Sequence, residues 1–369
     1  MKLYIRRWLI FLGIFLVVLA GLFWYLSSQT TLLDGVVRSL RYMGKNGSEK
    51  ITFETYGTTA YALVGDDLAV ASRSGVTLFS DSGETIGHRQ AELSAPALLG
   101  GQDAVLIYDV GGSFYGVMDT NGKMRFQGAS SGRIYDADLT EAGGAAVLSS
   151  ASDARAVVEV FDKNGTLLYR RTSKTSYLNA CALSPDGGWL AVATLGQEDI
   201  SFAPGAKLYR TNAEEEQASL SFGGQTIFDL KFLGNGTACA VGSRSISFFD
   251  TAGSLLGEYS LESADLLGYA FGDGFVTVMV DRHEAGSRYQ LLTLSTDGTV
   301  RASSTLQETP VHLSVAGEYL SVLTAQGLHI YDSALAQKSS REGNWTKAFV
   351  RRDGTAILVA VDEAEVYIP

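Results

Sequence analysis

The chain has few of the residues that cross-link or stiffen a small exported protein. Among its 369 residues are two cysteines, Cys181 and Cys239, and five prolines. Two cysteines exclude a disulfide framework. Both lie in apolar, strand-like segments (NACALS and TACAVG), which favours two buried thiols. A single bridge is the alternative, since export would permit one.

Catalytic motifs are also missing. The sequence contains no Gly-x-Ser-x-Gly elbow, no P-loop and no dinucleotide-binding fingerprint. Its four histidines, His88, His283, His312 and His329, lack metal-ligand spacing, and only His312 falls on an expected innermost strand. We therefore predict no catalytic residue, no metal and no cofactor, and a protein that is not an enzyme.

One acidic segment, Tyr135 to Gly144, offers Asp136, Asp138 and Glu141. It departs from a calcium-binding loop, which needs glycine where Glu141 stands. The sequence therefore predicts a hairpin with a solvated face at this segment.

The charge balance excludes a nucleic-acid partner. Beyond residue 26 the chain has 26 basic and 40 acidic residues, a net charge of −14. Such a surface repels nucleic acid and anionic lipid.

The N-terminus differs from the rest of the chain. Residues 8–26 are 19 residues without charge, about 28 Å as a helix and thus close to the thickness of a bilayer core. Basic residues precede this span, so residues 1–7 are expected in the cytoplasm and the remainder outside the cell membrane. A cleavable signal peptide ending near Ala20 is the alternative. Residues 27–49 form a linker, either a short amphipathic helix or a disordered stalk.

A repeat of about 40 residues runs from there to the C-terminus. A bulky residue is followed by a polar residue that opens a four-residue turn, at intervals of 39, 43, 48, 40, 45 and 37 residues. The opening residues are Ser80, Asp119, Asp162, Arg210, Asp250, Ser295 and Asp332. Glycine follows three residues later in five of the turns, where a positive φ is needed. Ala213 and Leu335 break this rule, so those two turns are expected to differ.

Strand repeats of this period are typical of a β-propeller. The segment ending at Tyr367 is the eighth copy of the third strand in the repeat, so residues 50–369 contain eight units. The last of these units has only three strands. Lys50 to Tyr56 can supply the missing outer strand. The prediction is an all-β, eight-bladed propeller closed by this N-terminal strand, with seven blades as the alternative.

Leu183 to Thr194 (LSPDGGWLAVAT) resembles the hairpin of WD40-like and cytochrome-type propellers, and Lys231 to Gly242 and Ala348 to Ala360 are weaker copies. The plan of one anchor and one exported propeller resembles a family of membrane-anchored bacterial propeller proteins without an assigned function. The Trp-Asp dipeptide of WD40 repeats and the repeated Trp of quinoprotein dehydrogenases are missing. The resemblance therefore implies the fold and no activity.

Two long connections between second and third strands are the candidate binding elements. They are Leu195 to Ala206 and Asp281 to Tyr289, both expected on the face that also carries the connections between blades. Long loops on a rigid scaffold often bind partners, although neutral variation in length also produces them. The candidate partner-binding residues are Glu198, Asp199, Phe202, Arg282, His283 and Arg288.

These features favour a membrane-anchored extracytoplasmic module that binds a protein or an envelope polymer. An exported hydrolase or lyase with its site at the channel mouth, and a ligand-sensing subunit of a membrane complex, are the alternatives.

Overall fold

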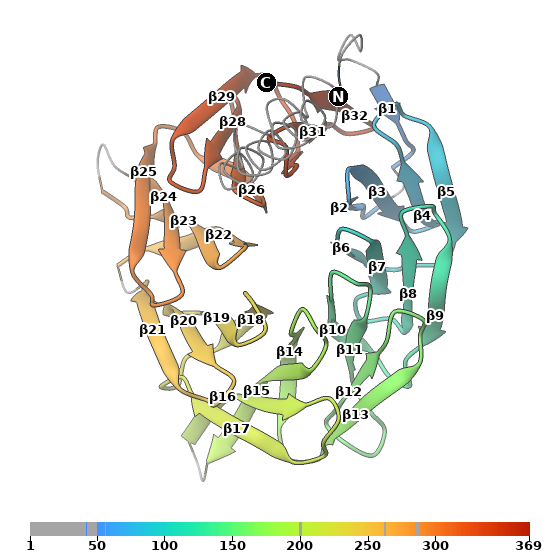
Figure 1. Ribbon diagram of the computed structural model, residues 1–369, viewed down its shortest axis with the longest axis vertical. Coiled ribbons are helices and arrows are strands. Elements are labelled where there is room, and N and C mark those ends of the chain that lie inside the picture. Colours follow the sequence, from blue (N-terminus) through green and yellow to red (C-terminus); the bar gives the residue numbers. More distant parts are fainter. Residues whose placement is uncertain (1–41, 43–49, 56, 199–200, 262, 285–287) are drawn as a thin grey trace, which may run out of the picture.

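A computed structural model describes residues 42, 50–55, 57–198, 201–261, 263–284 and 288–369. The described residues form eight antiparallel sheets of four strands each, arranged as blades around one axis (Figure 1). This confirms the predicted eight-bladed propeller and excludes the seven-bladed alternative.

The first four blades follow one another along the chain, each running from its innermost to its outermost strand. Blade 1 comprises β2 (Ala60–Val64), β3 (Asp67–Ser72), β4 (Gly75–Phe79) and β5 (Thr85–Gln90). Blade 2 comprises β6 (Pro96–Gly100), β7 (Ala104–Asp109), β8 (Phe114–Asp119) and β9 (Met124–Ala129). Blade 3 comprises β10 (Ile134–Leu139), β11 (Ala145–Ser149), β12 (Ala156–Phe161) and β13 (Leu167–Ser173). Blade 4 comprises β14 (Tyr177–Leu183), β15 (Trp189–Glu198), β16 (Ser201–Arg210) and β17 (Glu216–Ser221).

The next three blades repeat this order, and the eighth takes one strand from the other end of the described chain. Blade 5 comprises β18 (Ile227–Phe232), β19 (Thr237–Gly242), β20 (Ser245–Asp250) and β21 (Leu255–Ser260). Blade 6 comprises β22 (Asp265–Gly272), β23 (Phe275–Asp281), β24 (Tyr289–Ser295) and β25 (Val300–Leu306). Blade 7 comprises β26 (Pro310–Ala316), β27 (Tyr319–Thr324), β28 (Gly327–Asp332) and β29 (Gln337–Glu342). Blade 8 comprises β30 (Lys347–Val350), β31 (Ala356–Val359), β32 (Glu363–Tyr367) and, outermost, β1 (Lys50–Thr52).

The core lies between neighbouring blades. Second strands are mostly apolar because both of their faces are covered; every residue of β7 and β23 is buried. Outer strands such as β17 alternate between exposed and half-buried residues, because only one face packs against the blade.

The predicted repeat marker is a turn with a fixed hydrogen-bond pattern. Asp162 Oδ1 accepts the backbone N–H groups of residues 164 and 166, at 2.8 Å each, and Asp119, Asp250 and Asp332 accept the equivalent pairs. Gly165 follows with a φ of 84°. The expectation for Leu335 is wrong: this leucine adopts a φ of 60° in the same turn, and its buried side chain packs into the core.

The ring is closed as predicted. β1 pairs antiparallel with β32, Lys50 opposite Glu365 and Thr52 opposite Glu363. Ile51 is fully buried in this seam, and Phe53 packs against Tyr61 and Phe79 of blade 1. Closure thus joins both ends of the propeller in one sheet and leaves no free edge there.

The propeller has two faces, which we name by their connections. The first face carries the turns from first to second and from third to fourth strands. The second face carries the loops from second to third strands and the connections between blades. Lys50 opens β1 at the first face, and there Arg351 Nη1 donates a 3.0 Å hydrogen bond to the hydroxyl of Tyr42.

The predicted anchor at residues 8–26 and almost all of the 27–49 linker lie outside the described residues. Within the described part of the chain, no helix is long and apolar enough to cross a bilayer.

Candidate functional site

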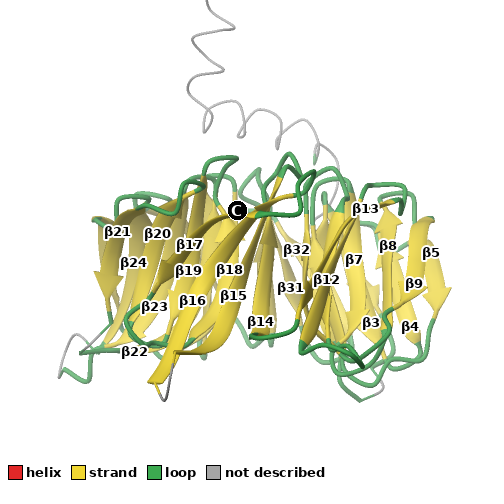
Figure 2. Cartoon of the chain, turned by 90° about the horizontal axis from the view of Figure 1, so that it is seen from below, coloured by secondary structure: helices red, strands yellow, loops and turns green. Residues whose placement is uncertain are grey.

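The connection predicted as a loop at Leu195 to Ala206 is a β-ribbon. β15 and β16 stay paired from Trp189 opposite Arg210 to Glu198 opposite Ser201, and the ribbon projects beyond the second face (Figure 2). The loop prediction is wrong because the backbone groups continue to pair across the hairpin, and polar residues suit a ribbon that meets water on both sides. Glu198 and Phe202 lie in its strands, whereas Asp199 lies outside the described residues.

The Asp281 to Tyr289 connection lies on the same face, two blades further on. Its basic side chains lie beside acidic and polar neighbours. Arg288 Nε donates to Asp281 Oδ2 at 2.8 Å, and His283, with a φ of 59°, places Nε2 3.1 Å from Asp265 and Nδ1 3.4 Å from Asp281. Burial alone would raise the pKa of Asp281, but the N–H of His283 and the guanidinium of Arg288 outweigh it and lower that pKa.

Arg282 forms hydrogen bonds with side chains of blades 5 and 6. Its Nη2 donates to the Tyr259 hydroxyl at 2.6 Å and its Nε to Gln290 at 3.1 Å. The structure therefore places both predicted elements on the second face and separates them by blade 5. The assignment of these six residues to partner binding stays a prediction.

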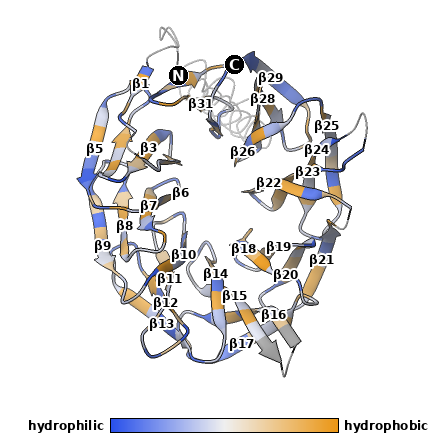
Figure 3. Ribbon diagram, turned by 180° about the vertical axis from the view of Figure 1, so that it is seen from behind, coloured by the Kyte–Doolittle hydropathy of each residue, from blue (hydrophilic) through white to orange (hydrophobic). Residues whose placement is uncertain are grey.

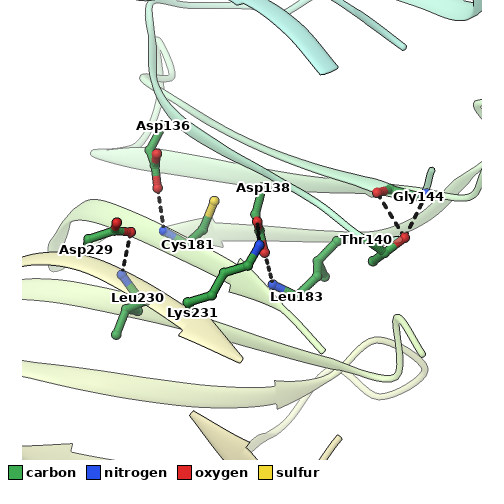
Figure 4. Close-up of polar contacts among 9 residues, drawn as sticks. All are labelled: Asp136, Asp138, Thr140, Gly144, Cys181, Leu183, Asp229, Leu230 and Lys231. Atoms are coloured by element: carbon green, nitrogen blue, oxygen red, sulfur yellow. Dashed lines mark hydrogen bonds and ion pairs between the residues drawn. The ribbon is translucent and has the colours of Figure 1, made fainter. Parts of the chain in front are cut away.

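A polar cluster in the channel wall is the feature that the sequence did not predict. Asp136 and Asp138 lie on β10, Cys181 on β14, and Asp229 and Lys231 on β18, all innermost strands (Figure 4). The predicted hairpin is present, since β10 pairs with β11 across the 140–144 turn, but the expected solvated face is wrong at Asp136 and Asp138. Alternation along β10 turns both carboxylates towards blade 4, where Asp138 is buried.

The carboxylates accept hydrogen bonds from the neighbouring blades. Asp136 Oδ2 accepts the N–H of Cys181, and Asp138 Oδ2 that of Leu183, both at 2.8 Å. Lys231 Nζ reaches across from blade 5 to Asp138 Oδ1 at 2.5 Å. Asp229 accepts the N–H of Leu230 at 2.7 Å and the hydroxyl of Tyr269, from blade 6, at 3.1 Å.

Burial sets the protonation of this cluster. It raises the pKa of Asp136 from 3.8 to about 7, with nearby Asp229 and Asp138 adding to the shift, and it also raises the pKa of Asp229. Burial would lower the pKa of Lys231, but the charge of Asp138 outweighs it, so that pKa is raised and the lysine stays charged. Burial likewise raises the pKa of the Tyr269 hydroxyl and of the Cys181 thiol.

The cluster joins four successive blades. A carboxylate with a pKa near 7 suits general acid–base chemistry, but each carboxylate here already accepts hydrogen bonds. Among the described residues, no group of histidine, cysteine and carboxylate side chains could hold a metal ion. Cys181 and Cys239 are both buried free thiols. The hydrogen bonds of the cluster connect blades 3 to 6, and we assign it to the seam between these blades.

His312 lies on an innermost strand, as predicted. Its Nδ1 is 2.9 Å from the carbonyl oxygen of Ala348 in blade 8, and its ring packs edge-on against Phe349. Burial, with a smaller contribution from the charge of Lys347, lowers its pKa to about 4, so it is neutral at physiological pH.

A cavity of about 430 Å³ opens around the axis at the first face. Seven of the eight innermost strands contribute to its lining, together with Arg351 and Arg352. Arg352 lies 3.5 Å from Glu141 and 3.3 Å from Asp273. The cavity therefore presents cations and carboxylates that are already paired.

The fold is similar to those of several solved propellers. The computationally designed Ika8 protein superposes with a TM-score of 0.63 at 15% identity, covering 88% of this chain and all of that one. The C-terminal WD40 domain of Sif2 gives 0.61 at 12% identity, covering 87% and 98%. BamB from Moraxella catarrhalis gives 0.55 at 14% identity, covering 87% and 99%. At such identities the likeness concerns the fold alone.

A search of curated protein sequences found no match. A family profile, in contrast, matches residues 38–361, nearly the whole described propeller. The chain belongs to this family, DUF5711, a family of unknown function.

Proposed function

We propose that the chain is a single-pass membrane protein whose extracytoplasmic propeller binds a protein or an envelope polymer with its second face. The observation that carries the proposal is that the N-terminal entry to the propeller and the two long connections lie on opposite faces. Tyr42 and the start of β1 lie on the first face, whereas the β15–β16 ribbon and the Asp281 to Tyr289 loop lie on the second. An anchor at residues 8–26 connects to the first face and leaves the second face directed away from the bilayer.

The charges on the connections bear on which face binds the partner. By sequence, first-face turns hold 13 acidic and 4 basic residues, and second-face connections hold 8 acidic and 7 basic residues. The acidic first-face turns repel acidic partners, while the nearly balanced second face does not. Binding is therefore favoured on the second face.

Cross-linking of the full-length chain in its native membrane tests the proposal. In one variant, residues 196–203 are replaced by Asn-Gly, which keeps the register because Gly196 pairs with Ala203. In a second variant the 282–288 loop is shortened to a tight turn. We expect a partner captured by the wild type to be lost from at least one variant. A matched control shortens the 211–215 turn on the first face; equal loss in that control, or equal capture in all samples, would refute the proposal.

A further inference from the structure

Exposed hydrophobic side chains gather on one rim of the propeller. Of twelve large hydrophobic residues exposed in the described part of the chain, seven lie on the second face. Five of these stand near the start of successive innermost strands, from blade 3 to blade 7. They are Tyr135, Tyr177, Phe228, Leu267 and Val311, exposed by 45, 53, 53, 42 and 52%. We call them the apolar crescent; Figure 3 shows hydrophobic colour along β18 and β22.

A β-bulge produces most of the crescent. In β10, β18, β22 and β26 the pairing register skips one residue, and the skipped residues are Tyr135, Phe228, Leu267 and Val311. A bulge residue has no partner in the ladder and its side chain is re-aimed, so these four reach the second face at the same position in each blade.

The fold does not require hydrophobic residues at this position. Blade 4 has the same bulge with Asn179 in it, and its strand pairs normally on both sides. The apolar residues that close the blades come just before the bulge, where Ile134 and Ile227 are buried. Repeated exposure of large apolar side chains in four blades is therefore explained by binding rather than by packing.

Free cations accompany the crescent. Arg133, Arg155, Lys174 and Arg244 lie on second-face connections of blades 3 to 5 and are exposed. Within the described residues none of the four forms an ion pair, in contrast to Arg288. Arg155 lies 4.5 Å above the ring of Tyr177, which joins the cations to the crescent.

We infer that the apolar crescent binds one segment of a partner protein, in which aromatic or aliphatic side chains alternate with Asp or Glu. Apolar residues of the partner segment would pack against the crescent, and its acidic residues would pair with the four cations. The acidic first face would repel the same segment. The crescent borders the channel mouth from blade 3 to blade 7 and, on the proposed function, faces away from the bilayer, which disfavours lipid as the occupant. The inference rests on that function and names the partner chemistry of its binding face.

Site-specific photo-cross-linking of the full-length chain in its native membrane tests the inference. Benzoylphenylalanine is placed at Phe228, at Leu267 and, as a control, at Leu255, which is exposed by 54% on the outer strand β21. A fourth sample carries it at Leu195 in the ribbon. We expect adducts from positions 228 and 267 to the same polypeptide, mapped to an apolar and acidic segment, and none from 255.

The mapped segment, made as a synthetic peptide, is then titrated against the purified full-length chain. Phe228→Ser should weaken binding about tenfold or more, whereas Leu255→Ser leaves it unchanged. Arg133→Glu with Lys174→Glu should weaken binding and reduce its salt dependence.

Each other outcome decides against the inference. Adducts to lipid, to a second copy of this chain or to a basic segment would overturn it, as would no adduct from 228 and 267. If position 195 gives a protein adduct while the crescent gives none, the proposed function stands and the inference falls. If neither gives an adduct, both fall.

Discussion

Asp136→Asn should stabilise the propeller at pH 8 and stabilise it much less at pH 4.5. Asp136 lies in the channel wall, where it accepts a hydrogen bond from the N–H of Cys181 at 2.8 Å. Asparagine keeps an acceptor for that bond and carries no charge. The substitution therefore isolates the effect of ionising this carboxylate.

The sign follows from the raised pKa. The folded chain holds the proton of Asp136 up to about pH 7, while the unfolded chain releases it near 3.8. The wild type thus loses stability as the pH rises from about 4 to 7, and keeps that loss above pH 7. A shift of this size corresponds to about 4 kcal/mol as an upper limit. Because the side chain is partly open to the channel, we expect about 1–2 kcal/mol to be recovered by Asn at pH 8.

Urea unfolding at pH 4.5, 6 and 8 measures the effect as a change in the midpoint at constant slope. Asp162→Asn is a control of opposite sign, because hydrogen bonds from Thr166 and Asn164 lower the pKa of Asp162. That variant should lose stability at all three pH values, because the stability that comes from a lowered pKa disappears only as the pH falls below about 3.8. If Asp136→Asn instead destabilises the chain equally at all three pH values, the carboxylate acts as a charged acceptor and the reasoning fails.

Three further predictions concern closure, insertion and the seam. A chain beginning at Gly57 should be about 3–6 kcal/mol less stable than one beginning at Ser48, since the burial of Ile51 and Phe53 is lost; equal melting of the two would contradict the closing role of β1. Leu16→Arg should impair insertion, at a cost of roughly 2.5–3.5 kcal/mol, and retention of the variant in carbonate-washed membranes would argue against a spanning helix. Lys231→Met should cost about 3 kcal/mol by leaving Asp138 buried without its cation. Adding Asp138→Asn should recover part of that loss in a double-mutant cycle, and purely additive effects would show that the pair is not coupled.

The repeat predicted the fold because the same turn closes blade after blade. The interval between successive turn-opening residues, such as Asp162, equals the length of one blade, and a bulky residue precedes each turn. The number of blades and the closing strand could therefore be predicted. The conformation of Leu335 could not be predicted, because a leucine with positive φ is stabilised by core contacts with residues that lie far away in the sequence.

The channel cluster was missed because its signal appears only when the innermost strands are aligned on their bulges. Asp136, Asp229 and His312 then share one position, and Asp138 and Lys231 share another two residues later. Read singly, each looks like a polar residue on an exposed strand. Bulges have no reliable sequence signal, so neither the cluster nor the apolar crescent could be located without the structure.

Tethering and ring closure involve the same blade. β1 completes blade 8 and, through residues 43–49, leads to Tyr42, whose hydroxyl is bound by Arg351 of the same blade. Arg351 also donates to the carbonyl of Asp66 in blade 1, across the closing seam. Arg351 thus connects Tyr42, blade 8 and blade 1 at the first face. If residues 8–26 form the proposed anchor, these contacts place it at the first face, and a partner that binds the apolar crescent approaches from the opposite face.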